Sequence, residues 1–225
     1  MYQMEIKTFS NQDFYETNAY LIVKDKKAIL IDCANQASEI LKYLQTNKIE
    51  LTHILITHGH YNHILGLEVI KEQFASAAVF IGQRDIICLY DCRANLSYKT
   101  GAEWEIKNEV ENVVPITKDS LINIDGIEFR LDLIGGYTRG SIIYKLMAEN
   151  MIFCGDTIYR TGLDHHWTDL KKCPNRKLKK SIRFIYKNFN DDCLIFPGHG
   201  EAGFTLGEVK NNNIIANKLA KYVSK

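Results

Sequence analysis

Thr57-His58-Gly59-His60-Tyr61-Asn62-His63 places three imidazoles within seven residues. The preceding stretch, Leu51–Ile56, reads as a buried strand, and the following one, Ile64–Phe74, has apolar residues at helical spacing. The histidines are therefore expected on a loop that leads from a strand to a helix. Imidazoles at such short spacing are typical transition-metal ligands, so the loop predicts a metal site.

The residues on the amino-terminal side of this loop predict strands followed by a helix. Apolar runs separated by polar turns predict three antiparallel strands, over Glu5–Phe9, Ala19–Val23 and Ala28–Asp32. A helical apolar face follows over Ala37–Gln45. Residues 91–111 mix charges and lone aromatics without a clear period, and we expect this segment to cover a site.

The second half of the chain again predicts strands followed by helices. Four consecutive strands are expected, over Ser120–Ile124, Ile127–Ile134, Ser141–Met147 and Met151–Cys154. A helical apolar stripe from Leu178 to Phe189, a short strand over Cys193–Phe196 and a weaker helix over Leu206–Tyr222 complete the pattern. Two such halves fit the α/β class, as a four-layer αββα sandwich of two mixed sheets flanked by helices. We expect residues 1–225 to form a single domain.

Composition and charge narrow the classes of function. A formal net charge of +1 and a pI near 7.6 give no general attraction to nucleic acid or to an anionic membrane. The first residues lack the apolar core of a signal peptide, and no stretch approaches the roughly 20 apolar residues of a membrane span, which predicts a cytoplasmic protein. Six cysteines without a Cys-x-x-Cys pair are expected to be reduced thiols.

Two later motifs place further ligand types at the ends of predicted strands. Asp156 follows Gly155, and His199 ends the run Pro197-Gly198-His199. Together with the His-x-His-x-x-His loop, this order of motifs resembles the metallo-β-lactamase-fold superfamily, especially its glyoxalase II-like hydrolases. The resemblance extends over nearly the whole chain.

The resemblance implies a set of metal ligands. In the family, two loop histidines bind a first ion, a third loop histidine and a late histidine bind a second, and an aspartate bridges them. The corresponding residues are His58 and His60, then His63 and His199, with Asp156 between the ions. For Asp32 the resemblance implies a role in orienting ligands, and a strand-end carboxylate that caps backbone amides is the alternative.

Two positions depart from the family's pattern. The loop aspartate is Asn62 here, and a neutral amide is a poor ligand for Zn²⁺. Tyr137 stands where the family has a histidine, and a phenol of pKa about 10 becomes a ligand only when a strong Lewis acid deprotonates it. Tyr137 is therefore expected to donate a hydrogen bond instead. His165 or His166 would be a replacement ligand, although loop histidines are more often simply exposed.

The leading hypothesis is a hydrolase that cleaves a thioester, an ester or a lactone with metal-activated water. Asp156, Asn62 and Tyr137 are the candidate catalytic residues, with Tyr137 donating to the developing oxyanion. One or two Zn ions are expected, with Fe or Mn as alternatives. The expected partner is a small-molecule substrate, and an anionic one would suit the basic residues between Lys171 and Lys187, which otherwise form a solvated helix face. Neither nucleic acid nor a membrane is expected.

Two other classes of function remain open. The candidate ligands would persist merely as hydrogen-bonded polar residues in an inactive descendant that binds a ligand or partner. A single iron held by two histidines and a carboxylate would instead support an oxidoreductase acting on a sulfur substrate. His53, in the strand before the loop, is expected to face away from the cluster and to be structural.

Overall fold

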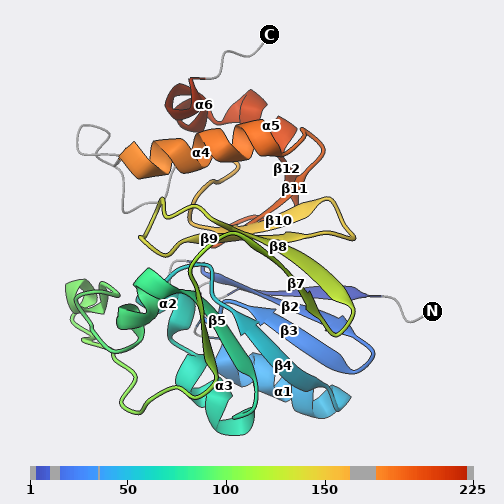
Figure 1. The fold of residues 1–225 in the computed structure, drawn as a ribbon, viewed down its shortest axis with the longest axis vertical. Coiled ribbons are helices and arrows are strands. Elements are labelled where there is room, and N and C mark those ends of the chain that lie inside the picture. The colour runs from blue at the N-terminus through green and yellow to red at the C-terminus, as the bar shows by residue number, and fades with distance from the viewer. Residues whose placement is uncertain (1–3, 11–15, 35, 163–175, 222–225) are drawn as a thin grey trace. The chain divides into compact units, whose positions relative to one another are not determined.

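The computed structural model describes residues 4–10, 16–34, 36–162 and 176–221. The chain divides into two compact units, Met1–Thr117 and Lys118–Lys225, and each contains one six-stranded sheet (Figure 1). That residues 1–225 act as a single domain stays a prediction. Among the described residues, every helix is too short or too polar to cross a membrane.

The sheet of the first unit has its strands side by side in sequence order. They are β1 (Glu5–Ser10), β2 (Asn18–Lys24), β3 (Lys27–Ile31), β4 (Glu50–Leu55), β5 (Ala78–Gly82) and β6 (Val113–Ile116). β1, β2 and β3 pair antiparallel, as predicted, whereas β3 to β6 pair in parallel. Parallel neighbours require long crossover connections, and these connections carry the unit's helices and the histidine loop.

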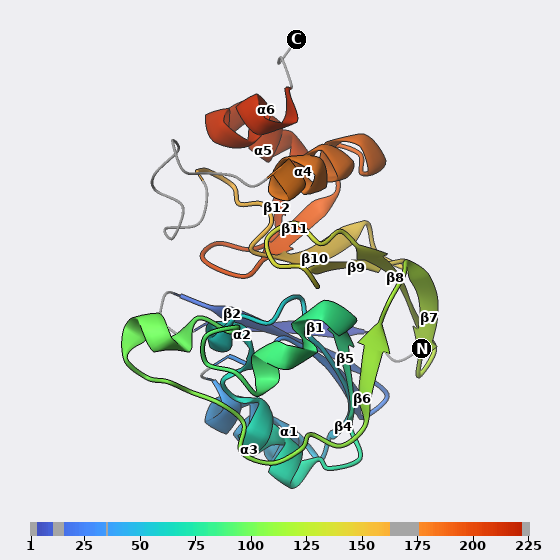
Figure 2. The same ribbon diagram turned by 60° about the vertical axis from the view of Figure 1, so that its left-hand side comes forward.

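The helices of the first unit lie in the connections between its parallel strands. They are α1 (Ala37–Asn47), α2 (Tyr61–Ile64) and α3 (Leu67–Gln73), with the 3₁₀ helices η1 (Gln83–Leu89) and η2 (Ser97–Thr100). Figures 1 and 2 show α1 and α3 along the same face, where Ile40 and Leu44 of α1 share an apolar cluster with Leu21 and Leu30 of the sheet.

The helical pattern expected over Ile64–Phe74 is split between α2 and α3. Gly66 precedes α3, and its N–H donates to the carbonyl oxygen of Cys33 at 2.7 Å. A Cβ at this position would lie 2.5 Å from the carbonyl oxygen of Ala34. The chain therefore bends where only glycine allows two backbone segments to approach so closely.

The strands of the second unit's sheet also lie side by side in sequence order. They are β7 (Ser120–Ile124), β8 (Ile127–Leu133), β9 (Ile142–Leu146), β10 (Met151–Gly155), β11 (Leu194–Pro197) and β12 (Phe204–Thr205). β7 to β10 form the predicted antiparallel run, and β10 pairs in parallel with β11. The β7–β8 hairpin turns at Asp125 and Gly126, with φ values of 50° and 78°, which a type I′ turn requires.

The helices described in the second unit lie on one side of its sheet (Figure 2). They are α4 (Arg176–Asn188), α5 (Leu206–Asn212) and α6 (Ile214–Ala220). Leu178, Ile182 and Ile185 of α4 form the predicted apolar stripe and join the cluster that contains strand residues such as Ile152. The helix expected over Leu206–Tyr222 is interrupted at Asn213, whose side-chain oxygen accepts the N–H of Ala216 at 2.9 Å and so begins α6.

Candidate metal centre

Three imidazole rings lie close together after β4: His58 and His60 are on the loop that leads to α2, and His63 is on α2 itself. The ring centroid of His58 lies 4.8 Å from that of His60 and 4.2 Å from that of His63. His58 and His63 are buried, with 1% and 0% exposure, and His60 is half-buried. The N–H of His63 donates to the carbonyl oxygen of His60 at 2.9 Å, so the turn of α2 returns His63 toward His58. Clustered imidazole nitrogens suit a transition-metal ion.

Asp32 orients one of these imidazoles and the start of the loop. It follows β3 with a φ of 57°, a conformation that Asp and Asn adopt more readily than most residues. Its Oδ1 accepts the N–H of Thr57 at 2.7 Å, and its Oδ2 accepts the Thr57 hydroxyl at 2.7 Å. The same Oδ2 lies 2.8 Å from Nδ1 of His63.

This contact decides which nitrogen of His63 is available to a metal. A carboxylate only accepts, so the proton of His63 belongs on Nδ1 and the lone pair on Nε2. Metal-binding histidines are commonly held by a carboxylate in this way. The residues of the loop thus fit a metal ion, and Asp32 has both of the roles considered for it, since it caps a backbone amide and orients a candidate ligand.

Asn62 is held within the first unit by Thr17. Its side-chain nitrogen donates to Oγ1 of Thr17 at 3.3 Å. The carbonyl oxygen of Thr17 in turn accepts the side-chain amide of Gln36 at 2.8 Å, and Gln36 is 3% exposed. Asn62 therefore lies beside a hydroxyl, and its amide presents no negative charge to a cation.

The second unit brings Asp156 and His199 together. β10 and β11 are parallel neighbours, so the residues that follow their carboxyl ends emerge at the same edge of the sheet. Asp156 is 4% exposed, and its Oδ2 lies 3.4 Å from Nε2 of His199. The two loops are also joined through the backbone, because the N–H of Gly198 donates to the carbonyl oxygen of Gly155 at 2.9 Å.

Arg160 forms ion pairs that connect the loop after β10 to the segment after β11. Its guanidinium contacts a carboxylate oxygen of Glu201 at 2.5 Å and one of Glu208, at the start of α5, at 2.8 Å. These neighbouring carboxylates raise the pKa of Arg160 above its ordinary value. Arg160 was not anticipated from the sequence, because a single arginine four residues after Asp156 has no distinguishing pattern. It links the loop that carries Asp156 to the segment that follows His199.

Tyr137 lies on the loop between β8 and β9. It is 8% exposed and belongs to the second unit's apolar cluster. The loop is shaped by Ser141, whose hydroxyl accepts the N–H of Thr138 at 2.8 Å and whose carbonyl oxygen accepts the N–H of Gly135 at 3.1 Å. The catalytic role of Tyr137 stays a prediction.

The remaining histidine predictions concern His53, His165 and His166. His165 and His166 fall outside the described residues. His53 lies on β4, where Nδ1 is 2.9 Å from Oγ1 of Thr52 and the ring packs 5.7 Å from that of Phe80 on β5, as suits a structural residue.

The cysteines of the described residues are free thiols, as expected: Cys33, Cys88, Cys92, Cys154 and Cys193. Burial raises the pKa of Cys88 to about 12 and that of Cys193 to about 11. These two side chains therefore remain protonated near neutral pH and pack as small apolar groups.

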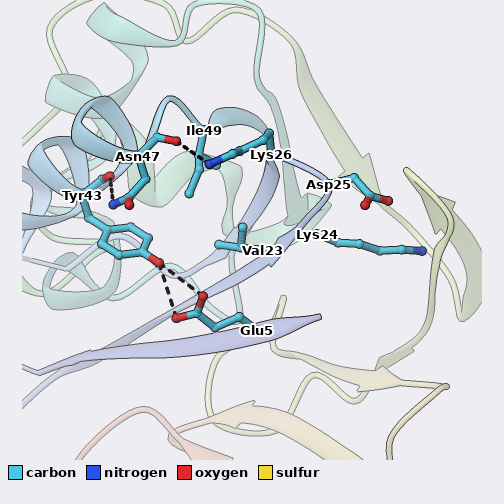
Figure 3. Close-up of a pocket in the computed structure, with 8 residues that line it drawn as sticks. All are labelled: Glu5, Val23, Lys24, Asp25, Lys26, Tyr43, Asn47 and Ile49. Carbon is cyan, nitrogen blue, oxygen red and sulfur yellow. Dashed lines mark hydrogen bonds between the residues drawn. The ribbon is translucent and has the colours of Figure 1, made fainter. Parts of the chain in front are cut away.

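A cavity of about 470 Å³ opens in the first unit beside the turn between β2 and β3 (Figure 3). The turn between β2 and β3 and the end of α1 line it. The Tyr43 hydroxyl lies 3.4 Å from a carboxylate oxygen of Glu5, and Nζ of Lys26 donates to the carbonyl oxygen of Asn47 at 3.0 Å. β4 starts beside this turn, and the histidine loop follows the opposite end of β4. The cavity is therefore separate from the imidazole cluster.

Comparison with known proteins shows the family to which the chain belongs. The family model described as the metallo-beta-lactamase superfamily matches residues 13–199. A probable metallo-hydrolase of Streptococcus pyogenes is 27% identical over 200 residues, which cover 87% of this chain and 84% of that protein. The hydroxyacylglutathione hydrolase GloC of Haemophilus influenzae is 24% identical over 208 residues, covering 90% of this chain and 94% of that protein.

A solved structure gives the same result for the fold. The crystal structure of the BLEG-1 B3 metallo-beta-lactamase covers 94% of this chain and 99% of its own, with a TM-score of 0.80 and 22% sequence identity. The expected α/β fold of two mixed sheets flanked by helices is therefore confirmed.

Proposed function

Because the chain belongs to the metallo-beta-lactamase superfamily, we propose that it is a metal-dependent hydrolase that cleaves a thioester, an ester or a lactone. The observation that carries this proposal is the contact between Nδ1 of His63 and the buried carboxylate of Asp32, inside a cluster of three imidazoles. A carboxylate in this position prepares Nε2 for a metal. The hydrolase names of two relatives support the reaction class.

The proposed ligands are the two sets described above, one from each unit: His58, His60, His63, Asp156 and His199. Their joint assignment rests on the ligand order that the sequence motifs share with the superfamily. One or two zinc ions are proposed, because imidazole and carboxylate are usual zinc ligands in hydrolases. Iron and manganese are the alternatives that the same ligand types accept.

Each residue near the reaction has a proposed role. A bound divalent metal would supply an acidified water molecule and polarise the substrate carbonyl. Asp156 would accept a hydrogen bond from the attacking water and so orient it. Tyr137 would donate a hydrogen bond to the carbonyl oxygen as negative charge develops there. Asn62 can orient neighbouring groups, but a neutral amide takes up no proton in this reaction.

The first test is metal content, measured by elemental analysis on protein purified without a metal-affinity tag and then incubated with Zn²⁺, Fe²⁺ or Mn²⁺. We expect one or two equivalents of zinc per chain and hydrolysis of at least one compound in a panel of thioesters, esters and lactones. His58→Ala should lose metal and activity. His53→Ala is the matched control, because this histidine lies on β4 outside the cluster, and it should behave as wild type.

Other outcomes would replace the proposal with a different class. Failure to retain any of the three metals, together with no turnover, would indicate an inactive descendant. Bound iron with oxygen consumption on a sulfur substrate, and no hydrolysis, would indicate an oxidoreductase.

A further inference from the structure

Gly59, between His58 and His60, is held by a buried carboxylate. Its N–H donates to Oδ2 of Asp85 at 3.0 Å. Asp85 lies on η1, 26 positions further along the chain, and is 2% exposed. A hydrogen bond from a backbone amide to an ionised carboxylate is roughly twice as strong as one between neutral groups. This bond therefore anchors the backbone between two candidate ligands.

η1 also packs so closely against the loop that position 59 has no room for a side chain. A Cβ on Gly59 would lie 2.6 Å from Cβ of Cys88, 2.7 Å from its Sγ and 3.1 Å from Cβ of Asp85. Contacts shorter than 3.0 Å essentially never occur for a real Cβ, so any larger residue would push the loop and η1 apart. The glycine is required by this close approach.

A second backbone hydrogen bond supports the other side of His60. The N–H of Tyr61 donates to the carbonyl oxygen of Asn95 at 3.0 Å. Asn95 is fully buried, and its side-chain nitrogen donates to the carbonyl oxygens of Cys88 at 2.9 Å and Trp104 at 3.0 Å. The segment after β5 is thus joined to the histidine loop at two points.

We propose that Asp85 is a positioning residue that sets the spacing of the His58 and His60 imidazoles through the backbone of Gly59. The inference rests on the proposed function, because it takes these imidazoles to be metal ligands. Ligands of one ion must be held within about 0.5 Å of the productive geometry. An anchor on the residue between two ligands controls both at once, whereas Asp32 bonds directly to a side chain.

The first measurement needs no metal. Amide hydrogen exchange of Gly59, followed by NMR in the metal-free protein, should be at least about tenfold faster in Asp85→Ala than in wild type. Asp85→Asn keeps an oxygen acceptor and should restore most of the protection. The amide of Tyr61 is an internal control, because its acceptor is the backbone of Asn95.

The second measurement is zinc affinity, by competition with a chromophoric chelator. Asp85→Ala should weaken binding by about 10- to 100-fold, and Asp85→Asn should recover most of that loss. Asp91→Ala is the matched control, since this carboxylate accepts the amides of Arg93 and Ala94 within the same segment. It should keep the wild-type affinity.

A second pair of variants covers the case in which Asp85→Ala fails to fold. Gly59→Ala should force η1 from the loop and weaken zinc binding, and the double variant Gly59→Ala/Cys88→Gly should regain part of the affinity because the closest atoms are removed. Unchanged exchange at Gly59, or unchanged zinc affinity in Asp85→Ala, would overturn the inference and leave the proposed function standing. A wild-type chain that binds no zinc would refute the proposed function, and the positioning role with it.

Discussion

Two buried aspartates flank the histidine loop and bond to different parts of it. The loop follows β4, Asp32 follows β3 and Asp85 follows β5, so the carboxylates come from the strands on either side. Asp32 bonds to an imidazole as well as to the backbone and hydroxyl of Thr57, whereas Asp85 bonds to the backbone amide between two imidazoles. A buried carboxylate is costly unless it is hydrogen-bonded, and both receive bonds from the loop that they orient.

Asp32→Asn should weaken zinc binding by about 10- to 100-fold with little effect on folding. Asparagine also tolerates a φ of 57° and its oxygen still accepts the N–H of Thr57, but its NH₂ group cannot accept from Nδ1 of His63. Chelator competition measures the change. Asp25→Asn is the control, because Asp25 has a φ of 51° and lies exposed on the β2–β3 turn. Equal affinities in both variants would contradict the role of Asp32.

Asn62→Asp should increase the metal retained per chain under identical loading conditions. The substitution replaces a neutral amide with a carboxylate, which is a far better ligand for a divalent cation. The contact with Thr17 survives, because the new oxygen accepts from the Thr17 hydroxyl. Elemental analysis after dialysis is the measurement, with Asn47→Asp at the end of α1 as control. No gain over wild type would show that Asn62 does not occupy a ligand position.

At the scale of elements, the sequence predicted strands better than the ends of helices. The antiparallel strands of both units alternate or run apolar between polar turns, and they lie where expected. β6 was missed because it contains Pro115, which lacks an N–H and is tolerated here at the edge of the sheet. The helices break at Gly66 and Asn213, where a close backbone contact and a side-chain cap decide the boundary.

α5 depends on a capping box. The hydroxyl of Thr205 accepts the N–H of Glu208 at 3.1 Å, and the Glu208 carboxylate accepts the N–H of Thr205 at 2.7 Å. Thr205→Ala should lower the free energy of unfolding by about 1 kcal/mol. In a chain of this size that corresponds to a fall in Tm of about 2–4 °C by thermal denaturation. Thr205→Ser keeps the hydroxyl, so an equal loss in both variants would exclude the cap as the cause.

At the scale of the whole molecule, bound metal should contribute to stability. A ligand that binds only the folded state stabilises it by RT ln(1 + [L]/Kd), or about 2.7 kcal/mol at 100 times Kd. Removing the metal with a chelator should therefore lower Tm by several degrees in wild type. His58→Ala should show a smaller shift. A wild-type Tm that is insensitive to both chelator and added zinc would favour the inactive descendant.

The order of motifs along the chain was sufficient to predict the family and the two mixed sheets. His58, His60, His63, Asp156 and His199 were identified as candidate ligands because each lies in a short motif that follows an apolar strand. Asp85, Asn95 and Arg160 were not, because their partners lie 26, 34 and 41 residues away along the chain in segments without a period. Such contacts depend on tertiary packing, which single-sequence patterns do not encode.

The sequential strand order of the first sheet has a consequence for synthesis of the protein. β1 to β6 take their neighbours in the order in which they leave the ribosome, and all six are complete by Ile116. No described strand of this sheet pairs with a strand from residues 118–221. The amino-terminal unit can therefore begin to fold during translation, with its imidazoles and both supporting aspartates in place before the remainder of the chain has been made.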